Sequence, residues 1–269
     1  MLSGGTDNCL TRSRSGRVRV PGVSGTEQNR QDALAADLDE MVAATERLCD
    51  TARGLDADAV RAPSGLPDWS RAHVLTHVAR NADGFVNLVT WARTGVETPV
   101  YASRESRAAD IEAGAGRSPG DLELDLNESA ERLLGAFAEP LSDDALQREL
   151  RLPSGSSLLG WEIARRRTRE VEIHHVDLGA GYVPASWPAA FVERTLDELS
   201  DLFRRERETP VGTLVATDTG GRWQVAADGP ELSGPAAALL AWLSGRSTGR
   251  DLTLEGASGS SVPLAPRWT

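Results

Sequence analysis

Residues 69–94 read WSRAHVLTHVARNADGFVNLVTWART, and this stretch decides the fold. Its apolar side chains recur at intervals of three and four residues, the period of a helix with one buried side. These side chains are Val74, Leu75, Val78, Ala82, Phe85 and Val89. Asp68 and Ser70 are both residue types that cap the start of a helix, and Gly95 can end one. The stretch therefore predicts one long amphipathic helix.

The same periodicity recurs on both sides of this stretch. Further helices are expected at about 32–52, 104–113, 118–137, 158–178 and 189–205. Long helices joined by short or moderate connections pack as an antiparallel bundle. We therefore predict a mainly α fold with a helical bundle over residues 31–208. Residues 1–30 have no such periodicity and are expected to be a disordered N-terminal extension.

The pattern changes after Pro210. Two β-like runs, an apolar helix and a last strand are expected there, at 212–217, 222–227, about 233–245 and 252–255. The two β-like runs are joined by Asp-Thr-Gly-Gly, a sequence that suits a hairpin turn. Residues 209–269 are therefore predicted to form a small C-terminal α+β domain.

The composition excludes several classes of protein. A net charge of −11 and a pI near 4.9 argue against binding to nucleic acid or to anionic membrane surfaces. The sequence has no uninterrupted apolar run of the roughly 20 residues that cross a bilayer. Cys9 and Cys49 lie far apart, so a disulfide framework is not expected and the reducing cytoplasm is the expected location.

The four histidines fall in two of the predicted helices. On the helix over 158–178, Glu170 and His174 are four residues apart and face the same way, at the edge of the buried side. Glu172 and His175 are an alternative pair by spacing, but they point to different sides. A helical wheel assigns one set of charged residues to the solvated face. This set is Glu162, Arg165, Arg166, Arg169 and Glu172.

On the helix over 69–94, His77 lies at the edge of the apolar side, whereas His73 lies further into the polar side. His77, Glu170 and His174 are therefore the candidate ligands of one divalent metal ion, with zinc expected. Two histidines and one carboxylate leave zinc an open coordination position, as in catalytic sites. Asp177 is either a hydrogen-bond acceptor for a ligand or a helix-end residue. An ordinary core or surface role for these histidines is the alternative, since a Glu/His pair at this spacing is a weak motif.

Three phrases of the sequence resemble one known family. WSRAHVLTHVARNAD (residues 69–83) and REVEIHHVDL (169–178) resemble the two metal-binding stretches of the mycothiol-dependent maleylpyruvate isomerase family. AWLSGR (241–246) resembles its C-terminal phrase, whose arginine is implicated in isomerisation. The resemblance implies a DinB-like four-helix bundle with a small C-terminal domain. By its motifs, the metal ligands correspond to His77, Glu170 and His174, and the arginine to Arg246.

The resemblance also implies a function. Such an enzyme uses the thiol cofactor mycothiol and a small-molecule substrate, maleylpyruvate or a related cis-enoyl acid, which isomerises by thiol addition and elimination. Arg246 would contact a carboxylate or a developing enolate; its alternative role is a charge at a helix C-terminus. A mycothiol S-transferase and a non-catalytic metal-binding or regulatory protein stay open as alternatives.

Overall fold

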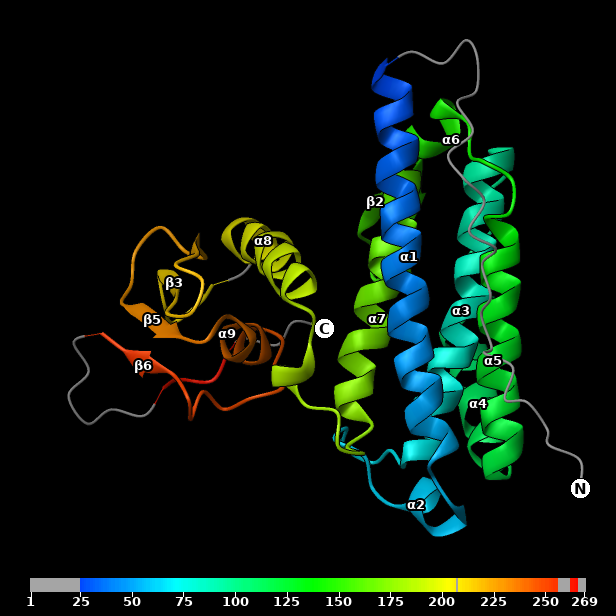
Figure 1. Ribbon diagram of the computed structural model, residues 1–269, viewed down its shortest axis with the longest axis horizontal. Helices are drawn as coiled ribbons and strands as arrows, with labels where there is room; N and C mark the ends of the chain where they lie inside the picture. The colour runs from blue at the N-terminus through cyan, green and yellow to red at the C-terminus, as the bar shows by residue number, and fades with distance from the viewer. Residues whose placement is uncertain (1–24, 207, 256–261, 266–269) are drawn as a thin grey trace, which may run out of the picture. The chain divides into compact units, whose positions relative to one another are not determined.

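We analysed a computed structural model of the chain, which describes residues 25–206, 208–255 and 262–265. The chain divides into two compact units, one up to Ala180 and one from Gly181 onward (Figure 1). The predicted mainly α fold with a smaller α+β part is confirmed. Of the predicted N-terminal extension, residues 1–24 lie outside the described residues, and the first helix begins at Gly25. Within the described ranges, no helix has the length and apolar content required to cross a membrane.

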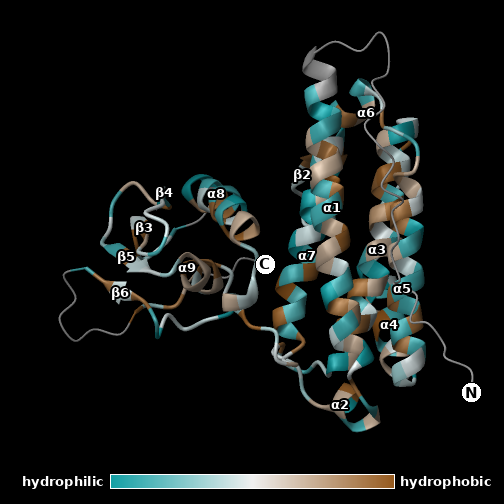
Figure 2. Ribbon diagram, viewed as in Figure 1, coloured by the Kyte–Doolittle hydropathy of each residue, from teal (hydrophilic) through white to brown (hydrophobic). Residues whose placement is uncertain are grey.

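The first unit is a bundle of four long helices. These are α1 (Gly25–Arg53), α3 (Arg71–Thr94), α5 (Pro119–Ala136) and α7 (Ile163–Asp177). Shorter elements connect them: α2 (Ala57–Arg61), α4 (Arg104–Ala115), α6 (Asp143–Gln147), the hairpin of β1 (Glu149–Arg151) and β2 (Ser157–Leu159), and the 3-10 helix η1 (Gly160–Glu162). Helix α3 is central, because it contacts α4, α5 and α7, while α1 packs against α5 and α7. Figure 2 shows brown hydrophobic segments alternating with teal hydrophilic ones along each long helix, as amphipathic helices require.

Helix α3 has the boundaries that its sequence predicts. Ser70 is the N-cap, and its hydroxyl accepts a hydrogen bond from the backbone N–H of His73. Gly95 has a φ of 75° and closes the helix by donating to the carbonyl of Trp91. Asp68, the other possible cap, has a positive φ of 62° in the preceding loop. The six apolar residues that predicted the helix are all buried.

The core of the bundle consists of two apolar clusters with polar side chains at their junction. One cluster includes Phe85 of α3 and Ile163 of α7, and the other includes Leu75 of α3 and Val171 of α7. Polar residues that belong to neither cluster lie between Leu75 and Phe85 of α3 and between Ile163 and Val171 of α7. These stretches contain His77 and Glu170, and His174 lies one turn beyond Glu170 on α7.

Gly114 brings α4 close to α3 at the same level. A Cβ atom at Gly114 would lie 2.2 Å from the side-chain Cγ2 of Thr76, so only glycine permits this packing. Thr76 directly precedes His77, and α4 therefore runs beside the histidine-bearing turn of α3.

The second unit consists of two helices and a four-stranded sheet. Its elements are the 3-10 helix η2 (Pro184–Ser186), α8 (Ala189–Glu206), β3 (Thr213–Ala216), β4 (Arg222–Gln224), β5 (Glu231–Gly234), α9 (Ala236–Leu243) and β6 (Thr253–Leu254). The strand order is β4-β3-β5-β6, in which β3 and β5 are parallel and the other pairs antiparallel. The predicted hairpin is the β3–β4 pair, whereas β5 was not predicted.

The division between the units differs from the predicted boundary at residues 208 and 209. Helix α8, predicted as a further bundle helix, contacts α9 and β4 of the second unit. The indole nitrogen of Trp223 also donates to the carboxylate of Asp197 at 2.6 Å. An amphipathic pattern shows that a helix has a buried face but not which element covers it, and this explains the difference.

Candidate metal centre

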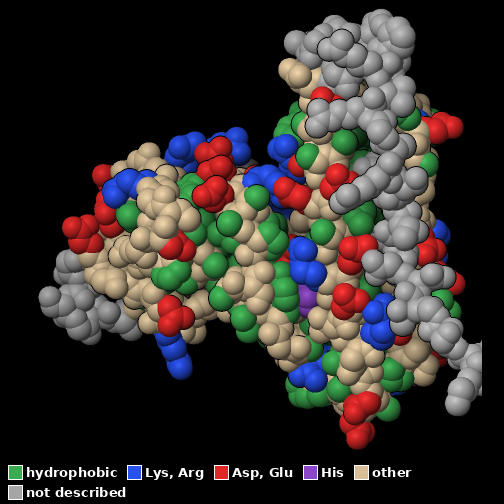
Figure 3. Space-filling model, in the orientation of Figure 1, with side chains coloured by type: hydrophobic (Ala, Val, Ile, Leu, Met, Phe, Trp, Pro, Cys, Tyr) green, Lys and Arg blue, Asp and Glu red, His purple; other side chains and the backbone are tan. Residues whose placement is uncertain are grey.

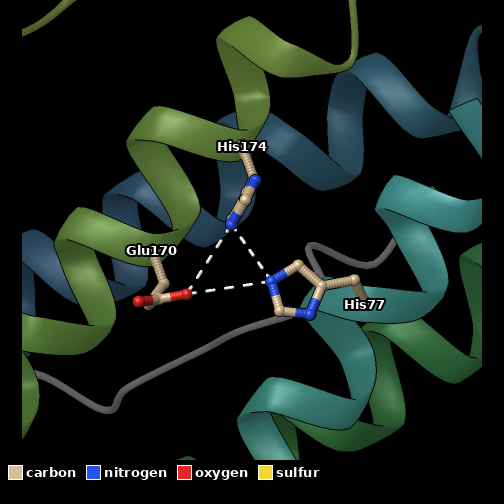
Figure 4. Close-up of side chains that lie close together, drawn as sticks. All are labelled: His77, Glu170 and His174. Carbon is tan, nitrogen blue, oxygen red and sulfur yellow. Dashed lines mark hydrogen bonds and ion pairs between the residues drawn. The ribbon is translucent and has the colours of Figure 1, made fainter. Parts of the chain in front are cut away.

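Three side chains from α3 and α7 converge at the junction of the two apolar clusters. His77 projects from α3, and Glu170 and His174 project from successive turns of α7 toward it (Figure 4). The Nε2 atoms of His77 and His174 are 3.0 Å apart. Oε2 of Glu170 lies 3.8 Å from the first nitrogen and 3.7 Å from the second. The structure thus brings together the three residues that the sequence selected.

The arrangement fits a small divalent cation. Three ligands on one tetrahedral zinc ion at about 2.0–2.1 Å lie roughly 3.4 Å from one another, and the observed separations of 3.0 to 3.8 Å bracket that value. The trio forms a group of potential ligand atoms that all lie within 4.8 Å of one another. Two imidazoles and a carboxylate are also a donor set that zinc prefers. The residues present therefore suit the ion.

The trio is partly exposed to solvent. The side chain of His77 is 5% exposed, whereas those of His174 and Glu170 are 15% and 22% exposed. On the face shown in Figure 3, histidine is visible as one small purple patch on the bundle. The two α7 side chains are thus the more exposed members of the trio.

His174 is oriented by the residue that ends its helix. Nδ1 of His174 lies 2.9 Å from the carboxylate of Asp177, which is 3% exposed. The two atoms lack the alignment of a hydrogen bond, but the carboxylate lies beside Nδ1, while Nε2 faces His77. The carbonyl of Asp177 in turn accepts a hydrogen bond from the N–H of Gly65 at 2.7 Å, which ties the end of α7 to the loop before α3.

The family of the chain follows from comparison with known proteins. The family described as the mycothiol maleylpyruvate isomerase N-terminal domain matches residues 41–179. The chain belongs to this family. A crystal structure of the mycothiol-dependent maleylpyruvate isomerase is similar at 30% identity and a TM-score of 0.79, covering 87% of this chain and 97% of that one. A histidine-to-alanine mutant of that isomerase gives 29% identity, a TM-score of 0.78 and the same coverage. No curated protein matches the chain.

In this member of the isomerase family, His77 lies in a cationic environment. Nη2 of Arg107, on α4, donates to Nδ1 of His77 at 3.1 Å. Burial, together with the nearby His174, Arg107 and Arg167, holds the pKa of His77 well below its usual value. A neutral imidazole is the form that binds a metal. The ring of Trp69 also lies edge-on to that of His77, with centroids 5.6 Å apart.

Several residues around the trio were not selected from the sequence. They are Trp69, Asn81, Tyr101, Arg107 and Arg167. Asn81 was detectable, because it lies four residues after His77 and so on the same side of α3. Arg107 was not detectable, since its place depends on the close packing of α4 against α3. Burial raises the pKa of the Tyr101 phenol, and Arg107 opposes this shift.

The predicted solvated face of α7 is partly wrong. Glu172 is 1% exposed and pairs with Arg47 of α1, and Arg169 is 6% exposed. The reason is that α7 packs against α1 as well as α3, so it has two buried sides rather than one. Glu162, Arg165 and Arg166 are partly exposed.

The other two histidines lie in structural contacts. His175 is buried, and its Nε2 lies 2.7 Å from the hydroxyl of Thr51 on α1. His73 is only partly exposed rather than a free surface residue: its Nδ1 accepts from the backbone N–H of Ser70 and completes the capping box of α3. Its Nε2 lies 3.2 Å from Glu112.

Arg246 lies just after the end of α9 in the second unit. Its backbone N–H donates to the carbonyl of Ala241, and its guanidinium donates to that of Ser244 at 2.7 Å. Gly245 has a φ of 75°, which turns the chain out of the helix at this point. The side chain is partly buried.

Proposed function

We propose that this protein is a metal-dependent, mycothiol-using isomerase of maleylpyruvate or a related cis-enoyl acid. The observation that carries the proposal is the convergence of His77, Glu170 and His174 in a chain of this family. The similar crystal structure is that of a mycothiol-dependent maleylpyruvate isomerase. A cytoplasmic location is part of the proposal, because a thiol cofactor needs reducing surroundings.

His77, Glu170 and His174 would hold the ion, which we propose to be zinc. When bound, zinc would supply an open coordination position that keeps the cofactor sulfur as thiolate at neutral pH. Asp177 would favour the His174 tautomer with its proton on Nδ1, because its carboxylate lies 2.9 Å from that nitrogen. Arg107 can only donate, so His77 accepts at Nδ1 and carries its proton on Nε2 here. Coordination through Nε2 requires that proton on Nδ1, so Arg107 would have to leave this contact.

The chemistry consists of an addition and an elimination. The thiolate adds to one carbon of the cis double bond, and the electron pair of that bond moves into the conjugated carbonyl as an enolate. The former double bond is then single and rotates. Re-formation of the carbonyl expels the thiolate and leaves the trans double bond. The cofactor is regenerated, and no oxidant or reductant is needed.

Arg246 is proposed as the catalytic arginine. A guanidinium binds a carboxylate or a developing enolate through two parallel hydrogen bonds, and maleylpyruvate carries two carboxylates. The support for this role is the resemblance of residues 241–246 to the C-terminal phrase of the family.

The test is an absorbance assay of maleylpyruvate with mycothiol, with and without a chelator. We expect turnover that requires catalytic amounts of mycothiol and stops when the metal is removed. Arg246→Ala is expected to lower turnover by about 100-fold or more while leaving the metal bound. Stoichiometric consumption of mycothiol with a stable adduct would indicate an S-transferase. Metal binding without turnover of either kind would indicate a non-catalytic protein.

A further inference from the structure

Arg167 is a buried arginine in the middle of α7, three residues before Glu170. Its side chain is fully enclosed, with 1% of the residue exposed. Its Nη1 donates to Oδ1 of Asn81 at 2.5 Å. Within the described part of the chain, its Nη2 has no hydrogen-bond partner and the guanidinium forms no ion pair. Burial lowers the pKa of Arg167 to about 10, so the group stays charged at neutral pH.

The burial of such a residue lowers the free energy of unfolding, so stability alone does not explain its presence. A buried charge without a paired carboxylate loses its hydration and gains little in return. An apolar residue of similar length would fill the same space without this penalty. A charge kept at this position therefore points to a role in the neighbouring site.

Arg167 determines which way the amide of Asn81 faces. A guanidinium has only donors, so the atom of Asn81 that meets it must be the oxygen. The amide nitrogen then faces the other way, where Nδ2 lies 3.3 Å from Oε2 of Glu170. The opposite orientation would set two donors against each other at Arg167 and two acceptors against each other at Glu170.

The oxygen that Asn81 contacts is the one that faces both histidines. Oε2 of Glu170 is the atom 3.8 Å from His77 Nε2 and 3.7 Å from His174 Nε2. The other oxygen, Oε1, lies 4.0 Å from Nε of Arg166. The contact from Asn81 thus bears directly on the carboxylate atom that would bind the ion.

We propose that Arg167 and Asn81 are positioning residues for Glu170: Arg167 orients the Asn81 amide, and that amide holds the carboxylate toward the two histidines. This inference rests on the proposed metal site. Contacts behind a metal ligand typically change metal affinity by about 10- to 100-fold. The positioning effect of Arg167 acts through Asn81, so this effect disappears once Asn81 is replaced.

The test is a zinc titration of the chelator-treated full chain, in competition with a chromophoric chelator. We expect Asn81→Leu and Arg167→Met each to weaken zinc binding by about 10- to 100-fold. The double variant is expected to bind no more weakly than Asn81→Leu alone. Arg165→Met is the matched control on α7, since Arg165 pairs with Asp37 and does not contact Asn81. It is expected to bind zinc as the unaltered protein does.

A second measurement separates positioning from a purely structural role. Thermal unfolding of the metal-free chain is expected to show Arg167→Met at least as stable as the unaltered protein, because an unpaired buried charge has been removed. Lower metal-free stability with unchanged zinc affinity would instead make Arg167 structural. If Arg167→Met does not fold, Asn81→Leu tests the same contact with Glu170.

The remaining outcomes are also distinct. Zinc binding by the unaltered protein and equally tight binding by both single variants would overturn the positioning role and leave the metal centre standing. If the double variant lost zinc affinity by the product of the two single losses, the two residues would act separately. This outcome would also overturn the positioning role. No zinc binding by the unaltered protein would refute the proposed metal centre itself.

Discussion

Helix α7 carries two clusters of glutamate and histidine on two different sides. Glu170 and His174 face His77 of α3, and their ligand atoms converge on one point. Glu172 and His175 face α1, where the acid pairs with Arg47 and the imidazole meets the hydroxyl of Thr51. Glutamate and histidine residues within six positions of one helix thus lie in two different environments.

The difference between the clusters lies in what the facing helix supplies. Helix α1 supplies a cation for the acid and a hydroxyl for the imidazole, so each group there has a complementary partner. Helix α3 supplies a further imidazole, so three groups that can each offer a lone pair to a cation meet at 3.0 to 3.8 Å. A shared cation satisfies such a group of lone pairs best. Spacing within one helix does not distinguish the proposed metal cluster from the cluster that faces α1, but the groups on the partner helix differ.

The largest expected effect is on metal content. His77→Ala, Glu170→Ala and His174→Ala are each expected to reduce bound zinc from about one ion per chain to near zero, because a two-ligand site rarely holds the ion. His175→Ala is the matched control from the α1 side and is expected to keep the full content. Elemental analysis by mass spectrometry measures both. Full zinc in any of the three ligand variants would remove that residue from the site.

The second effect concerns stability at mildly acidic pH. Burial, with a further contribution from Arg47, lowers the pKa of His175 from 6.5 to about 4. Between pH 6.5 and pH 4, His175 binds a proton in the unfolded chain but not in the folded chain. The contribution of neutral His175 to the free energy of unfolding is therefore complete above about pH 7 and decreases as the pH falls. From pH 7.5 to pH 5 the loss from His175 is about 2 kcal/mol.

Urea denaturation of chelator-treated protein at the two pH values measures this loss. His175→Gln is expected to reduce the pH dependence by that amount, because glutamine does not titrate. The pKa of His77 is also lowered by burial, so His77 adds to the loss of stability at low pH. This part of the pH dependence should remain in His175→Gln. An unaltered pH dependence in His175→Gln would show that His175 does not titrate in this range.

The smallest effect is on the ion pair that faces α1. Glu172→Gln keeps the shape of the side chain but removes its charge opposite Arg47, which is 37% exposed. We expect a loss of about 1 kcal/mol in the free energy of unfolding, because solvent screens the exposed partner. Zinc content should not change. A loss of zinc instead would mean that the two clusters are not independent.

The sequence predicted the convergence of His77, Glu170 and His174, because these residues lie on faces with a clear helical period. It did not predict the two-sided burial of α7, since a helical wheel assumes one buried side and α7 has two. Glu172 was thus separated from Glu170 correctly, but for a wrong reason: it faces α1 rather than solvent. His175 also faces α1, so the prediction that Glu172 and His175 point to different sides is wrong. Arg107 and Arg167 escaped prediction because their roles come from tertiary packing, at Gly114 and at Asn81 respectively. The small strand β5 escaped because its four residues carry too little pattern.

The distance along the chain between His77 and His174 has a consequence for when the proposed metal site can form. His77 and His174 are 97 positions apart in sequence, so the cluster exists only after α3 and α7 have docked. A metal that binds only the folded chain cannot template its early folding, and it acts instead by mass action on the finished bundle. At a free concentration of 100 times its dissociation constant, it adds about 2.7 kcal/mol to stability. If the proposed metal site is correct, the amount of bound metal would therefore measure the fraction of molecules that have folded correctly.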